Sequence, residues 1–271
     1  GRFWMDRSWW GGNGTVTSSL WNELTRDELN DRLPSAVVVL PTGATEQHGP
    51  HLVTGHDSFT VEHIAWQAAG SVGGDLDVIV APTLMFGSSA HHLQFGGSLS
   101  LSTATYRAVV TDLVSSILAA GASRILLLNG HGGNHELNQL VVRDLALAQP
   151  ADTPVALAAA SYWDIAAASL TADERIAGFR KPGHAGQFET STMLAMAPDR
   201  VREPRPARDD DPSLATVVPG VRVEQTGWWR TFDGYTDSPA RATAEQGEII
   251  LEHVVRDVAE ALRAFAAVGS S

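Results

Sequence analysis

The densest group of chemically capable residues is the segment 42–51, Thr-Gly-Ala-Thr-Glu-Gln-His-Gly-Pro-His, with Asp57 shortly after it. Glu46 and His48 are two positions apart, so in an extended chain their side chains point the same way. Asp57 follows the Gly49-Pro50 turn and can return to the same place. Two carboxylates and an imidazole suit a hydrolytic metal site, although each residue is also ordinary in a solvated loop.

Three further polar clusters strengthen the metal interpretation. Residues 129–134 place His131 in a glycine-rich turn, and glycine lets the backbone approach a ligand closely. Residues 183–191 contain His184 and, five positions later, Glu189. We expect both to face one cavity from the first turns of a helix, although Glu189 could instead serve the helix dipole. Residues 87–92 form the last cluster.

Apolar runs must position these clusters. Residues 36–40, 78–82, 123–128 and 154–158 are predicted to be strands. Helical spacing of apolar residues predicts helices at 57–69, 109–118, 137–148 and 249–265. Alternating strands and helices predict an α/β fold with a mostly parallel sheet and helices on both faces. The carboxyl edge of such a sheet is where sites are built.

Composition narrows the class of protein. The 271 residues fit one large α/β domain spanning 1–271, with 1–15 interpreted as a flexible or expression-derived start. The net charge of -12 argues against nucleic acid or an anionic membrane as partner. The chain has no Cys, so metal ligands must be His and carboxylates. Without a membrane-length apolar run or a signal-peptide pattern, the expected location is the cytoplasm.

Together the four clusters resemble the creatininase (creatinine amidohydrolase) family. The resemblance runs from Leu24-Thr25, through the Glu46–His51 and Asn129–Asn134 motifs and His184-Ala185-Gly186, to the segment 242–247. It implies a three-layer αβα sandwich, a homo-oligomer (a hexamer by family pattern) and a dinuclear metal centre. We expect two divalent ions, zinc by preference and manganese or iron otherwise.

The resemblance also implies residue roles. Glu46 and His131 would hold one ion, His48 the other, and Asp57 would bridge both. Glu189 would complete the second ion's ligands, because this chain has Gly133 where creatininase proper carries a glutamate. His184 matches the histidine that shuttles protons. A histidine suits that task because its pKa lies near working pH.

Departures from the family pattern bear on the substrate. His56 replaces a small residue before the bridging aspartate, and His91 replaces a glutamate. The residues expected to bind substrate are Ser89, His92, Gly132 and Trp163. The Trp228-Trp229 pair is expected in core or subunit contacts, with a pocket wall as the alternative, and Trp4, Trp9 and Trp10 on a neighbouring subunit.

The expected function is metal-dependent hydrolysis of a C–N amide bond, first of all a cyclic one, in a small-molecule substrate. A peptidase-like, formamide-hydrolysing or lactone-hydrolysing member of the same family is the alternative. A metal-dependent binding protein without turnover is the alternative from another class.

Overall fold

The computed structural model describes residues 19–176, 178–179, 181–208 and 223–268. The start at 1–15, with its three tryptophans, lies outside the described residues, as does most of the acidic stretch 204–219, predicted to be a surface loop.

Four parallel strands form the central sheet, in the order β2-β1-β3-β4. They are β1 (Val37–Thr42), β2 (Val78–Val80), β3 (Arg124–Asn129) and β4 (Ala156–Ser161). The valine- and leucine-rich runs of β1 and β3 are almost wholly buried, as expected for parallel strands covered on both faces. The predicted parallel sheet is confirmed.

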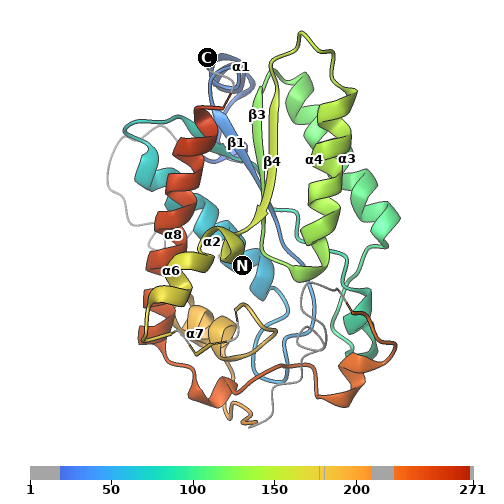
Figure 1. Cartoon of the computed structure of the whole chain (residues 1–271), viewed down its shortest axis with the longest axis vertical. Helices are drawn as coiled ribbons and strands as arrows, with labels where there is room; N and C mark the ends of the chain where they lie inside the picture. The colour runs from blue at the N-terminus through green and yellow to red at the C-terminus, as the bar shows by residue number, and fades with distance from the viewer. Residues whose placement is uncertain (1–18, 177, 180, 209–222, 269–271) are drawn as a thin grey trace.

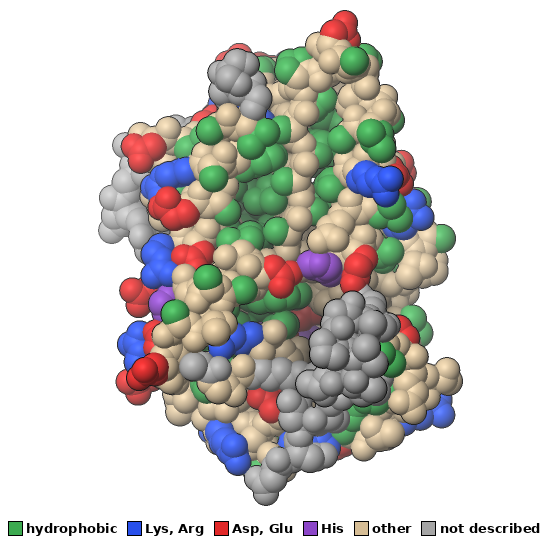
Figure 2. All heavy atoms as spheres, viewed as in Figure 1, with side chains coloured by type: hydrophobic (Ala, Val, Ile, Leu, Met, Phe, Trp, Pro, Cys, Tyr) green, Lys and Arg blue, Asp and Glu red, His purple; other side chains and the backbone are tan. Residues whose placement is uncertain are grey.

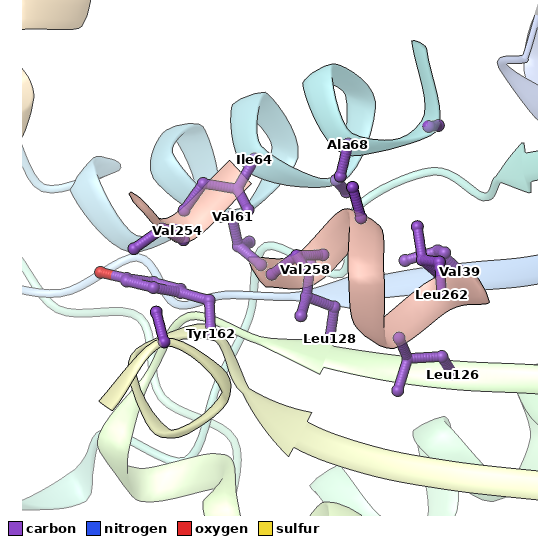
Figure 3. Close-up of a cluster of buried hydrophobic side chains, with 14 of the residues drawn as sticks. Val39, Val61, Ile64, Ala68, Leu126, Leu128, Tyr162, Val254, Val258 and Leu262 are labelled. Carbon is purple, nitrogen blue, oxygen red and sulfur yellow. The ribbon is translucent and has the colours of Figure 1, made fainter. Parts of the chain in front are cut away.

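Helices cover both faces and complete three layers (Figure 1). One face packs on α2 (His56–Val72) and α8 (Ala244–Ala266), the other on α3 (Thr103–Ala119) and α4 (His135–Ala148). Val37 and Val39 of β1 join the first core, whereas Val38 and Leu40 join the second, because alternate strand residues face opposite sides. Figure 3 shows Val39 in the core that α2 and α8 close.

Several boundaries differ from those the sequence predicts. The last strand begins later and runs to Ser161, because its pairing with β3 continues from Ala156 to that residue. Helix α8 begins five residues early, at a capping box formed by Thr243 and Gln246. Helix α3 is likewise extended to Ser102, whose side chain accepts the Thr105 N–H. Helix caps and strand pairing determine where these elements begin and end, and the spacing of apolar residues carries no information about either.

Shorter elements complete the described part of the chain. The helices are α1 (Arg26–Arg32), α5 (Tyr162–Ile165), α6 (Ala167–Ala172) and α7 (Gln187–Met196). The 3-10 helices are η2 (Trp21–Glu23), η3 (Ala90–Phe95), η4 (Gly132–Asn134), η5 (Pro198–Arg200), η6 (Trp228–Thr231) and η7 (Pro239–Arg241). The expectation that His184 lies on a helix is wrong: it precedes α7 in a loop, while Glu189 lies in the first turn.

The loops at the carboxyl edge of the sheet gather in the lower half of Figure 1, beside α7. Figure 2 shows histidine and acidic side chains near the middle of this face, below the apolar surface between α8 and α4. Among the described residues, no helix is both long and apolar enough to span a bilayer.

Candidate metal centre

The five predicted metal ligands come together from separate parts of the fold. Glu46 and His48 lie in the loop after β1, Asp57 at the start of α2, His131 after β3, and Glu189 in the first turn of α7. All five are at least 95% buried. A buried set of three carboxylates and two imidazoles is unlike a solvated loop surface, since such groups are seldom buried without partners.

One half of the centre is built around His131. Its Nδ1 lies 3.3 Å from Glu46 Oε1 and 3.0 Å from Asp57 Oδ2. On the other side of the ring, Nε2 lies 3.2 Å from both the Ser88 carbonyl and the Ser89 hydroxyl. Donation from Nε2–H to these oxygens leaves Nδ1 facing the two carboxylates, whose charge raises the His131 pKa well above its usual value, and Nδ1 can bind a metal once its proton is released.

The other half is built around His48. Its Nε2 lies 2.9 Å from Asp57 Oδ1 and 3.7 Å from Glu189 Oε2. Its Nδ1 is 3.1 Å from the Glu46 carbonyl, so the ring donates there and turns its Nε2 to the carboxylates, where it can bind a metal once its proton is released. Glu189 Oε2 accepts the backbone N–H of Ala185 at 2.5 Å. Asp57 therefore reaches both halves, with one oxygen toward each histidine.

Two asparagines explain why these loops hold their positions. The Asn129 amide donates to the His131 carbonyl at 2.7 Å and accepts the His131 N–H at 3.1 Å, which closes the turn after β3. Asn134 joins two further loops, donating to the Gly43 carbonyl and accepting the Ser88 N–H, each at 3.0 Å. The two amide side chains hydrogen-bond to backbone N–H and C=O groups of these loops.

The electrostatics fit ligands that lack their cation. Burial alone would raise the pKa of Asp57, but attraction to His48 and His131 holds it below its usual range. Burial opposes charge on His48, yet the carboxylates around it raise its pKa to about 10. For Glu189 burial prevails and raises the pKa to about 8. Without a cation, protons compensate part of the carboxylate charge.

Unsatisfied buried atoms are the direct test of whether a metal fits. Among the described residues, Glu46 Oε2, His48 Nε2 and Asp57 Oδ2 are buried and have no hydrogen-bond partner. Such atoms are costly, and all three belong to the five proposed ligands. Oxygen and imidazole nitrogen are the donors that zinc and manganese bind. The residues present therefore fit divalent metal ions.

A second network holds His184 beside the ligands. The Gln47 side-chain nitrogen lies 2.9 Å from His92 Nδ1 and 3.0 Å from both the Gly234 carbonyl and His184 Nε2. We assign its two hydrogens to the Gly234 carbonyl and His92. His184 Nε2 then donates to the Gln47 backbone carbonyl at 2.9 Å. This consistent assignment leaves the His184 Nδ1 lone pair directed toward Glu46, whose Oε1 is 3.6 Å away.

A cavity of about 770 Å³ opens over the ligands. Of the residues expected to bind substrate, His92, Gly132 and Trp163 line it. Ser89 is fully buried instead, and its hydroxyl contacts His131 Nε2, so the structure places it behind a ligand.

The cavity also contains residues that the sequence interpretation left unassigned or favoured elsewhere. Trp228 and Trp229 both line it, and the Trp229 ring stands edge-on to His92 at 4.4 Å. The role of Gln47 was not foreseen either. Its position between Glu46 and His48 was the available signal, because an amide side chain between two metal ligands needs hydrogen-bond partners close to the site.

The comparisons with known proteins agree with this geometry. Residues 22–262 match the family model "Creatininase: Creatinine amidohydrolase". The chain is 33% identical over 257 residues to "Creatinine amidohydrolase" of Pseudomonas putida, covering 89% of this chain and 95% of the relative. It is 30% identical over 247 residues to "Mycofactocin precursor peptide peptidase" of Mycolicibacterium smegmatis, covering 88% of each.

A solved structure described as "Creatininase Mn" has a TM-score of 0.75 and 30% identity, covering 92% of this chain and 98% of that chain. The shared fold, the buried His and carboxylate cluster and the matched length agree. The chain belongs to the creatininase family of hydrolases that act on C–N amide bonds.

Proposed function

We propose that this protein is a dinuclear metal-dependent amidohydrolase. The observation that carries the proposal is the convergence of five buried ligand side chains in two halves that share Asp57. Glu46 and His131 would hold one ion, and His48 and Glu189 the other. Zinc suits this set best because it accepts imidazole and carboxylate together, with manganese or iron as alternatives.

The bound ions would supply activation of water at neutral pH and polarisation of the scissile carbonyl. The chain itself supplies proton transfer. Burial and the neighbouring histidines hold the pKa of His184 well below its usual value, so the ring is neutral and one of its nitrogens keeps a lone pair. Its Nδ1 would take a proton from the attacking water and deliver it to the leaving nitrogen.

Substrate orientation would come from His92 and the aromatic wall. Because His92 Nδ1 accepts from Gln47, its Nε2 carries the hydrogen and points toward the ligands, 3.7 Å from Glu46 Oε1. That N–H could donate to a polar substrate atom above the centre. Trp163, Trp228 and Trp229 supply apolar surface against which the substrate can pack.

The cavity volume favours a second candidate substrate within the same chemistry. A volume of about 770 Å³ lies well inside the range of sites for drug-sized ligands and exceeds what one small cyclic amide fills. A peptide end or another extended amide is therefore a candidate substrate beside the cyclic amide. Formamides and lactones are the other substrates to be tested.

The test is a substrate screen joined to metal analysis. Chelated and metal-reloaded protein would be assayed against cyclic amides, short peptides, formamides and lactones. We expect two ions per chain and activity on C–N substrates only after reloading. Full activity in chelated protein with no metal bound would refute the proposal. Lactone hydrolysis without amide hydrolysis would refute the C–N assignment alone.

A further inference from the structure

His56 is a buried histidine at the first position of α2, immediately before Asp57, and the proposed function does not use it. It is only 1% exposed. Among the described residues, neither of its ring nitrogens has a hydrogen-bond partner. A fully buried imidazole with both nitrogens unsatisfied is costly, and native proteins seldom keep one without a ligand or water.

The ring lies within reach of the second half of the centre. Its centroid is 4.9 Å from that of His48, and its Nε2 is 4.0 Å from Glu189 Oε1. One ligand atom each from His48, His56, Asp57 and Glu189 can be chosen so that all four lie within 4.8 Å of one another.

These separations suit one ion. Bonds of about 2.0–2.1 Å in a tetrahedral zinc site place the ligand atoms about 3.4 Å apart. His48 Nε2 lies 2.9 Å from Asp57 Oδ1 and 3.7 Å from Glu189 Oε2, and His56 Nε2 lies 4.0 Å from the other Glu189 oxygen, so the separations fall on both sides of that value.

Local packing fixes the position of the His56 backbone, which carries the ring. The His56 N–H donates to the Val53 carbonyl at 3.2 Å, which closes the turn before the helix. Gly55 is the N-cap, and a Cβ there would lie 2.6 Å from the Phe59 ring, so the helix start packs closely. His56 and Asp57 are thus delivered together by one rigid helical turn.

We propose that His56 is a further ligand of the ion held by His48, Asp57 and Glu189. The inference rests on the metal centre of the proposed function. It makes the two ion sites unlike: the second has two imidazoles, whereas Glu46 and His131 give the first only one. Imidazole suits zinc and carboxylate suits manganese, so the second site should select zinc over manganese more strongly than the first.

The experiment compares wild type with His56→Gln, His56→Phe and the control His63→Gln. Glutamine offers an amide N–H that can donate to Glu189 but cannot supply an imidazole, whereas phenylalanine fills the space and does neither. His63 lies on the same helix and belongs to none of the groups of potential ligands found among the described residues. Zinc and manganese affinities would be measured by competitive titration, with stoichiometry from elemental analysis.

In wild type and His63→Gln we expect two ions per chain. In both His56 variants one of the two zinc sites, assigned to His48, Asp57 and Glu189, should lose more than about 100-fold in affinity, beyond the 10–100-fold typical of losing a residue that only supports a ligand. Its preference for zinc over manganese should fall, and the other site should keep its affinity. Cobalt-loaded wild type should show three metal-shifted imidazole N–H proton signals, and His56→Gln two.

The opposite results overturn the inference. Unchanged zinc affinity and three shifted signals in His56→Gln would show that His56 is not a ligand. Near-wild-type affinity in His56→Gln with a loss only in His56→Phe would make it a hydrogen-bonding support for Glu189. Wild type that binds fewer than two ions would instead refute the dinuclear centre itself, which separates the two failures.

Discussion

Replacing His184 by alanine gives the sharpest test of the proposed chemistry. The ring contributes no ligand atom in the proposed scheme, yet its Nδ1 lies 3.6 Å from Glu46 Oε1 at the centre. His184→Ala should therefore keep two ions and lose proton transfer. General acid–base catalysis contributes about 10² to 10⁴-fold, or about 2.7–5.4 kcal/mol of barrier at 1.36 kcal/mol per tenfold.

The substitution also has a structural cost that must be separated from the chemical one. It removes the donor to the buried Gln47 carbonyl, which costs about 1–3 kcal/mol of stability when unsatisfied. It also removes a ring stacked on His92 at 4.1 Å. A lower melting temperature is expected, so turnover must be expressed per folded, metal-loaded molecule.

Thr236→Val is the matched control. The Thr236 hydroxyl accepts the His184 backbone N–H at 2.9 Å, so this variant loosens the same loop and leaves the imidazole in place. Turnover would be measured on two amides that differ in leaving-group basicity.

The defect of His184→Ala should shrink for the better leaving group, which needs less protonation, whereas any defect of Thr236→Val should be equal for both. A metal-replete, folded His184→Ala enzyme with unchanged turnover would remove His184 from the mechanism. Loss of metal would make it a ligand.

Three more outcomes are expected. Asp57→Asn should lose both ions and Glu189→Gln mainly one, because Asp57 directs one oxygen toward the histidine of each half; equal losses by elemental analysis would contradict the bridge. Gly133→Ala should reduce metal affinity and Gly132→Ala should not, because a Cβ at 133 would collide with the Ser88 carbonyl whereas one at 132 meets nothing within 4 Å; matching zinc titrations of the two variants would refute this. At pH 7, loading should release about three protons, since pKa values of about 10 for His48 and about 8 for Glu189, together with a pKa of His131 well above its usual value, keep all three groups protonated without metal. Zinc affinity should therefore rise from pH 6 to 8, and calorimetric heats independent of the buffer's ionisation enthalpy would exclude the release.

The sequence alone determined the layers of this protein and the neighbourhood of its site. Runs such as Val37–Thr42 are too apolar to lie anywhere except inside a sheet covered on both faces. Once the strands are parallel, the segments that follow them must meet at one edge. The proximity of Glu46, His131 and Asp57 follows from this topology, which is why their grouping could be predicted.

Only the tertiary structure decided which way the polar side chains turn. Ser89 lies behind His131 instead of in the cavity, and Gln47 holds His92 through its amide. Trp229 reaches His92 from 137 residues further along the chain. These arrangements depend on hydrogen bonds and packing between segments remote in sequence. They could not be predicted from hydrophobic periodicity, because periodicity indicates only which face of each segment is buried. The pattern of residues therefore determined where ligands gather, while contacts between distant loops determined their orientation and the shape of the cavity above them.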